Sequence, residues 1–68
     1  MRKRIIICSD KVAYELITDW LHDFYVDLKI HKINERTMAI EFETDYKSDG
    51  ELMNYLWSHC RMSEIEIF

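Results

Sequence analysis

Residues 37–45, TMAIEFETD, carry large apolar side chains at positions 38, 40 and 42, with Ala39, Glu41 and Glu43 at the alternate positions. In an extended chain successive side chains point to opposite faces, so Met38, Ile40 and Phe42 share one face and the glutamates share the other. A strand with this pattern belongs to a sheet that has one face packed on a core and the other face open. The segment therefore predicts a half-covered sheet, and its acidic side faces either solvent or a partner.

Three further segments are predicted as strands. Residues 4–8 (RIIIC) are short and β-branched, while residues 26–32 and 63–68 alternate in the same way as residues 37–45. Asn34 tolerates the left-handed conformation of a tight turn, so it is predicted to join residues 26–32 to the next strand as a hairpin.

Two segments are predicted as helices. Residues 11–24 carry apolar side chains at offsets 0, 3, 4, 7, 8 and 11, which form one stripe of a helix. Either residue of the Ser-Asp pair at 9–10 can cap this helix. The second helix is predicted to run to about residue 60, with Ser48 and Glu51 forming a capping box at its start.

The predicted order is strand, helix, strand, strand, helix, strand in one domain, residues 1–68. Right-handed crossovers fold this order into an α+β, split βαββαβ arrangement. It is a four-stranded antiparallel sheet in the order 4-1-3-2 with two helices on one face. The architecture resembles the ferredoxin-like superfold over the whole chain, and this resemblance implies no function because the superfold hosts many.

The side chains expected to form the core lie on the helix-covered face. They are Val26, Leu28, Ile30, Met38, Ile40, Phe42, Ile65 and Ile67, with Trp20, Leu21 and Phe24 of the first helix packed against them. In residues 4–8 the run of three isoleucines leaves two possibilities. Either Ile6 with Cys8, or Ile5 with Ile7, points to the open face.

The open face is the candidate binding site. Its predicted residues are Asp27, Ala39, Glu41, Glu43, Glu64, Glu66 and Phe68. Two interpretations remain open. In one, Arg2 and Arg4 pair with Glu43 and Glu66, and the face is only a solvated surface with internal ion pairs. In the other, an apolar centre surrounded by charge binds a protein.

Composition limits the partners. The net charge of −4 argues against nucleic acid and against an anionic membrane surface, because both attract basic proteins. No apolar run approaches the roughly 20 residues of a membrane-spanning helix. The apolar stretch that follows the basic start, Ile5 to Cys8, is shorter than the roughly 7 to 15 residues of a signal peptide. We therefore expect a cytoplasmic protein in which Cys8 and Cys60 are free thiols.

The chain offers no motif for catalysis. The residue six positions after Cys8 is Tyr14 and not the arginine of a Cys-x5-Arg motif, and no glycine lets the backbone wrap a phosphate there. His22, His31 and His59 are scattered over different predicted elements. No pair of residues has the spacing of metal ligands. We therefore expect no enzymatic activity, no cofactor and no metal site.

Two functions follow as hypotheses. The first is a small acidic protein-binding module whose partner has a basic surface. In size and composition it resembles the inhibitors that phages and mobile elements direct at host factors, such as anti-CRISPR proteins and antitoxins. The alternative is a homo-oligomeric regulatory or ligand-binding domain that resembles ACT domains, although the loop after the first strand, CSDK, lacks their usual glycine. Whether the protein is a monomer or a homodimer distinguishes the two.

Overall fold

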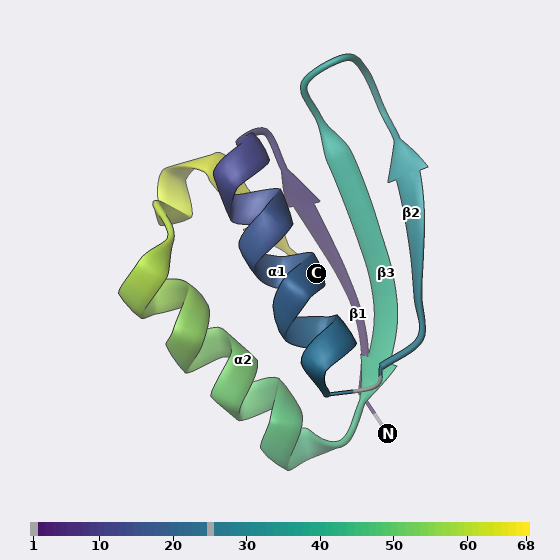
Figure 1. The fold of residues 1–68 in the computed structure, drawn as a ribbon, viewed down its shortest axis with the longest axis vertical. Helices are drawn as coiled ribbons and strands as arrows, with labels where there is room; N and C mark the ends of the chain where they lie inside the picture. Colours follow the sequence, from purple (N-terminus) through teal and green to yellow (C-terminus); the bar gives the residue numbers. More distant parts are fainter. Residues whose placement is uncertain (1, 25) are drawn as a thin grey trace.

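A four-stranded antiparallel sheet with two helices forms the molecule. The computed structural model describes residues 2–24 and 26–68, apart from the side chain of Met62. Its elements are β1 (Arg2–Cys8), α1 (Lys11–Asp23), β2 (Leu28–Lys32), β3 (Met38–Thr44), α2 (Tyr46–His59), the 3₁₀ turn η1 (Met62–Glu64) and β4 (Ile65–Ile67). The strand order β2-β3-β1-β4 is the predicted order 4-1-3-2 counted from the other edge, so the ferredoxin-like fold is confirmed (Figure 1).

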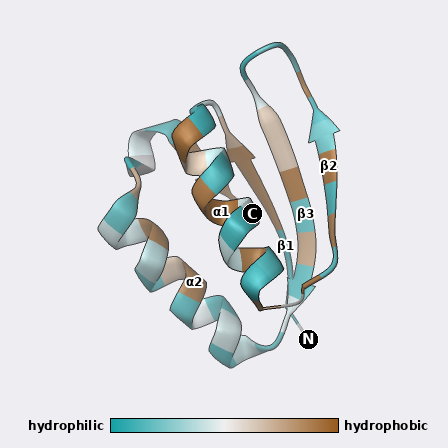
Figure 2. Cartoon of the chain, in the orientation of Figure 1, coloured by the Kyte–Doolittle hydropathy of each residue, from teal (hydrophilic) through white to brown (hydrophobic). Residues whose placement is uncertain are grey.

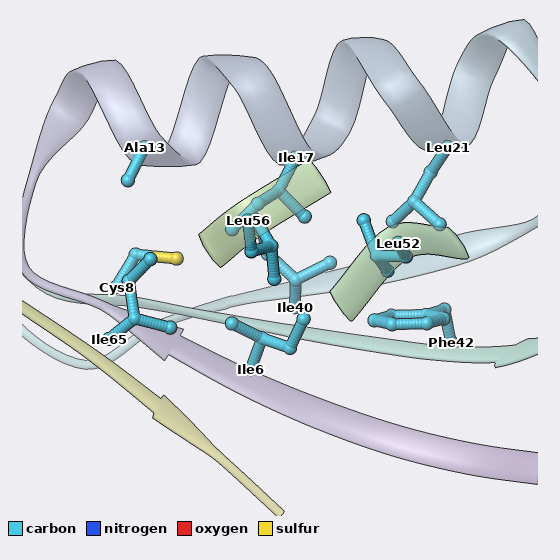
Figure 3. Packing of buried hydrophobic residues seen from close by; sticks show 10 residues of the cluster. All are labelled: Ile6, Cys8, Ala13, Ile17, Leu21, Ile40, Phe42, Leu52, Leu56 and Ile65. Atoms are coloured by element: carbon cyan, nitrogen blue, oxygen red, sulfur yellow. The ribbon is translucent and has the colours of Figure 1, made fainter. Parts of the chain in front are cut away.

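The core lies between the helices and the central strands. Ile17 and Leu21 of α1 are fully buried, as are Leu52 and Leu56 of α2. Figure 3 shows these side chains meeting those of the strands. The cluster consists of Ile6, Cys8, Ala13, Ile17, Leu21, Ile40, Phe42, Leu52, Leu56 and Ile65. The predicted helical stripe of α1 is therefore correct at Leu21.

Burial decreases from the centre of the sheet to its edges. The register places Ile30, Ile40, Ile6 and Ile67 in one row across all four strands on the helix side. The two central members are fully buried, whereas Ile67 is half-buried and Ile30 is 41% exposed. Figure 1 shows the reason: β2 lies on the far side of β3 from both helices. The prediction that Ile30 is buried was therefore wrong.

Phe24 also differs from its predicted place. It follows the last residue of α1 as the C-cap, and its ring is half exposed instead of packed against the sheet. The ring stacks on Trp20 at a centroid distance of 4.2 Å. Trp20 is partly buried against the core, so the aromatic pair covers the end of α1.

The phase of β1 is settled by its burial pattern. Ile6 and Cys8 are buried on the helix side, which turns Ile5 and Ile7 to the open face. Because side chains alternate along a strand, Arg2 and Arg4 also lie on the helix side and Lys3 lies on the open side. Figure 2 shows the corresponding alternation of hydrophobic and hydrophilic bands along β2 and β3.

The two helix starts differ in how well they were predicted. Asp10 caps α1, since its carboxylate accepts from the backbone N–H of Val12 at 3.3 Å. The capping box at Ser48 was wrong, because α2 begins directly after β3 with Asp45 as its N-cap. The Asp45 carboxylate accepts from the backbone N–H of Ser48 at 2.6 Å. Ser48 is thus inside the helix.

Smaller differences concern the strand ends. β2 begins at Leu28, two residues later than predicted. β4 begins at Ile65 because the preceding residues form η1, in which the Glu64 N–H donates to the carbonyl of Arg61. The predicted hairpin is confirmed. The side-chain oxygen of Asn34 accepts from the backbone N–H groups of residues 36 and 37, both at 2.9 Å.

Candidate functional site

The open face, opposite both helices, is organised in rows that cross the sheet. One row is His31, Ala39, Ile7 and Glu66, and the next is Lys29, Glu41, Ile5 and Phe68. Phe68 belongs to this row because its backbone exchanges two hydrogen bonds with Ile5, at 2.9 and 3.3 Å. Glu43 and Lys3 face each other in a third row.

An apolar strip runs across this face from the central strand β1 to the edge beside β4. Ile5 is 38% exposed and Phe68 is 64% exposed, and Ile7 beside them is half-buried. Ala39 also lies here, but it is buried between Ile7 and His31 on the neighbouring strands. The contact area that a partner could use therefore comes from Ile5 and Phe68, and the predicted contribution of Ala39 is small.

Glu41 is held by an ion pair with Lys3 and a hydrogen bond with His31. One carboxylate oxygen lies 3.3 Å from Nε2 of His31, and the other lies 3.6 Å from Nζ of Lys3. The hydrogen bond from His31 is the main reason that the pKa of Glu41 is lowered, and the charges of Lys3 and Lys29 act in the same direction. Glu41 is thus partly neutralised and is a weaker attractor of a basic partner than the sequence indicates.

Glu43 and Glu66 have a different environment. Within the described residues neither carboxylate has an ion-pair partner within 4 Å. The predicted pairs with Arg2 and Arg4 were wrong, because both arginines lie on the helix side and pair with Asp49 instead. Glu43 and Glu66 are exposed on the open face.

The remaining predicted carboxylates border two shallow hollows. A hollow of about 220 Å³ is lined by Lys3, Asp27, Leu28, Lys29, Glu41, Phe42 and Glu43. A second, of about 200 Å³, is lined by Ile7, Ser9, Thr37, Ser63, Glu64 and Glu66. Asp27 lies just before β2, and Glu64 lies in η1 just before β4. The fold therefore brings Asp27, Glu41, Glu43 and Glu66 to the open side of the sheet, around the apolar strip. Glu64 also borders a hollow between the start of α1 and the end of α2.

A larger cleft was not predicted. It has a volume of about 430 Å³ and is lined by Cys8, Ser9, Asp10, Lys11, Tyr14, Glu15, Glu35, Arg36 and Met38. It separates the start of α1 from the β2–β3 hairpin. These segments are distant in the sequence, and only the chain's pairing of β3 with β1 brings them together, so no local pattern could have indicated the cleft.

The thiol that lines the cleft is not an activated nucleophile. Cys8 is buried, and its burial is the main reason that its pKa is raised to about 11. A thiol with such a pKa stays protonated at neutral pH and is a poor nucleophile. Both cysteines are free, as expected. In residues 2–24 and 26–68, no group of three or more His, Cys, Asp or Glu side chains could hold a metal ion.

No protein-family model matches the chain, and no curated protein matches it significantly. Among the described residues, no helix is both long enough and apolar enough to cross a membrane. The interpretation of the open face therefore depends on its own geometry and charge.

Proposed function

We propose that the protein is a small, non-enzymatic protein-binding module that uses its open sheet face. The observation that carries this proposal is the exposed apolar strip of Ile5 and Phe68 between two unpaired carboxylates, Glu43 and Glu66, among the residues that the structure describes. Apolar contacts at the centre of an interface supply affinity, and charges at the rim supply association rate and specificity.

The charge of this face favours a partner with a basic surface. Five carboxylates lie on or beside it, against Lys3, Lys29 and a histidine. Many proteins that bind nucleic acid carry such basic surfaces. We therefore propose that the chain acts in the cytoplasm as an inhibitor of a nucleic-acid-binding host factor, in the manner of phage or mobile-element proteins. The acidic face would occupy the groove that otherwise takes nucleic acid.

Reversing the unpaired charges tests the proposal. Glu43→Lys combined with Glu66→Lys removes charge complementarity and breaks no ion pair of the described chain. With a partner purified by affinity capture on the tagged protein, we expect the association rate to fall strongly while the melting midpoint stays near that of the wild type. Glu41→Lys is less informative because it also breaks the contacts to Lys3 and His31.

The matched control places the same charge change on the helices. Glu15→Lys combined with Glu51→Lys alters the net charge equally, and both residues are exposed outside the open face. The control should retain most of the wild-type association rate. If both double variants slow association equally, overall charge and not the open face explains the binding.

The second candidate function is a ligand-binding regulatory domain. The cleft of about 430 Å³ beside the β1–α1 loop supports it, since small-molecule sites usually have volumes of about 300–1,000 Å³. Titration with free amino acids and nucleotides, followed by NMR, tests this function through the signals of Tyr14 and Met38. Ligand-dependent shifts at these two residues would favour it, and unchanged signals at millimolar ligand would exclude it for these compounds.

A further inference from the structure

The two edge strands of the sheet carry opposite charges. β2 contains Lys29, His31 and Lys32 and no carboxylate, whereas β4 contains Glu66 and directly follows Glu64. Among the described residues, Lys29, Lys32 and both of these glutamates lack an ion-pair partner within 4 Å. The basic edge and the acidic edge are thus both available for pairing.

Both edges also present free backbone groups. At the end of β2 the N–H of Ile33 donates to the carbonyl of Thr37, so Ile33 directs its backbone groups toward the β3 side. Backbone groups in an antiparallel strand point alternately to the two sides. The backbone groups of Leu28, Ile30 and Lys32 therefore point away from β3. Beside β4, Phe68 exchanges two backbone hydrogen bonds with Ile5 of β1. By the same alternation, the backbone N–H and C=O groups of Ile65 and Ile67 point away from β1. The edge strands can therefore each accept another strand.

The apolar side chains at the two edges lie on the same side of the sheet. Ile30 is exposed on the helix side of β2, because neither helix covers that strand. Ile65 and Ile67 of β4 lie on the helix side as well. A strand added beside β2 with its apolar residues on this side would cover Ile30, which the fold of one chain leaves open.

The direction of the strands permits this pairing between copies of the chain. Each neighbouring pair in the order β2-β3-β1-β4 is antiparallel, so β2 and β4 run in opposite directions. A second copy displaced along the sheet therefore presents its β4 antiparallel to β2. Its helices then lie on the same side as those of the first copy.

We infer that the protein associates head to tail, with β2 of one copy pairing with β4 of the next. Charge sets the register: Lys29 lies opposite Glu66 of the partner subunit. Leu28 is then opposite Ile67 of the partner subunit, Ile30 opposite Ile65 of the partner subunit, and His31 opposite Glu64 of the partner subunit. Each of these four pairs matches apolar with apolar or basic with acidic.

Pairing of identical edges is disfavoured by the same charges. Two β2 strands centred on Ile30 would place Lys29 opposite His31 of the partner subunit, with the lysines of both strands close together. Two β4 strands would bring the Glu66 carboxylates of both copies together. Like charges across strands are destabilising. Because a head-to-tail interface uses two different surfaces, it builds rings or open chains and not a closed two-fold dimer.

A mixing experiment tests this inference independently of any other partner. Lys29→Glu and Glu66→Lys are prepared separately, and self-association is measured by sedimentation equilibrium at low salt from about 10 µM to about 1 mM. We expect the wild type to associate reversibly and each variant alone to associate about tenfold more weakly or worse. An equimolar mixture of the two should regain association. At one interface the glutamate at position 29 of the first variant faces the lysine at position 66 of the second. At the next interface the unchanged Lys29 of the second variant faces the unchanged Glu66 of the first.

Matched controls account for net charge and folding. Lys47→Glu and Glu51→Lys make the same charge changes on the exposed side of α2 and should associate like the wild type. Thermal melts at low concentration verify that each variant is folded. The inference is overturned if the wild type stays monomeric over this range, if the single variants associate as well as the wild type, or if the mixture associates no better than its components.

Discussion

The guanidinium of Arg4 makes a two-point ion pair with the carboxylate of Asp49. Nε lies 2.8 Å from Oδ1, and Nη2 lies 2.9 Å from Oδ2. Arg2 adds a contact at 3.4 Å to the same carboxylate. The pair is shielded from solvent, with side-chain exposures of 15% for Arg4 and 8% for Asp49. It joins the start of β1 to the first turn of α2, two segments that are 45 positions apart.

Asp49→Asn should destabilise the fold. The substitution removes the charge that both arginines contact and leaves a guanidinium partly buried without a counter-ion. A hydrogen bond to a charged group contributes about 1.5–3 kcal/mol, and we expect a loss of about that size in the free energy of unfolding from urea titration. Glu51→Gln, an exposed carboxylate two positions away, should change it little. Equal losses from both variants would contradict a special role for Asp49.

The same pair predicts an acid sensitivity. The hydrogen bond from Arg4 is the main reason that the pKa of Asp49 is lowered in the folded protein. A depressed pKa means that the stabilisation is fully present above the unfolded value of about 3.9 and is lost as the pH falls through the folded value. The wild-type midpoint should therefore fall more steeply below about pH 4 than that of Asp49→Asn. Parallel pH profiles of the two proteins would be the contrary result.

The N-cap of α2 gives a prediction with an internal control. Asp45→Ala removes the carboxylate oxygen that accepts from the backbone N–H of Ser48. In the wild type this hydrogen bond is the main reason that the pKa of Asp45 is lowered. Ser48→Ala leaves this backbone hydrogen bond intact and removes only the hydroxyl, whose contact with Asp45 has a smaller effect on the pKa of that carboxyl. Melting curves should show a clear loss of stability for Asp45→Ala and a smaller loss for Ser48→Ala. A larger loss of stability from Ser48→Ala than from Asp45→Ala would indicate that Ser48 is the cap.

Gly50→Ala should stabilise the protein. Gly50 is the one glycine of the chain and lies within α2, where a Cβ atom would have no heavy atom within 4 Å. Glycine in a helix interior costs about 0.5–1 kcal/mol relative to alanine. The free energy of unfolding should increase by about this amount in urea titration. A decrease in the free energy of unfolding would contradict the open space around a Cβ atom at this position.

Leu21→Ala tests the packing of α1. Leu21 is fully buried in the core (Figure 3). Large-to-small substitutions of this kind cost about 2–5 kcal/mol, which is a large part of the stability of a domain of this size. Val12→Ala on the exposed side of the same helix is the control. An unchanged midpoint for Leu21→Ala would show that the apolar stripe does not form the core.

The periodic segments were predictable because the face of each residue follows from its neighbours. In β3 the period of two places Ile40 and Glu41 on opposite faces of the sheet. Because only one face is covered by helices, Ile40 belongs to the core and Glu41 to the open face. In α1 the spacing of Ile17 and Leu21 assigns them to one buried stripe. Both results depend on local sequence, and the element order then selects the topology.

The remaining features depend on contacts between distant segments. The run of isoleucines in β1 is apolar on both sides, so the sequence did not indicate on which face of the sheet Arg4 lies. Once Ile6 faces the helices, Arg4 meets Asp49, and the pairs predicted with Glu43 and Glu66 cannot form. At the start of α2, Asp45 and Ser48 both have the chemistry of a cap. The longer helix, which presents Asp49 to Arg4, was not visible in the local pattern.

The most direct test of the proposed binding face is site-specific photocrosslinking in cells that produce the protein. A photoreactive phenylalanine analogue replaces Phe68 on the open face in one sample and Trp57, an exposed residue of α2, in another. We predict a crosslinked product of one partner, distinct in mass from a second copy of the chain, from position 68 only. The product should disappear when Glu43→Lys and Glu66→Lys are added. A partner crosslinked from position 57 but not from position 68 would contradict the proposal that the open sheet face is the binding surface.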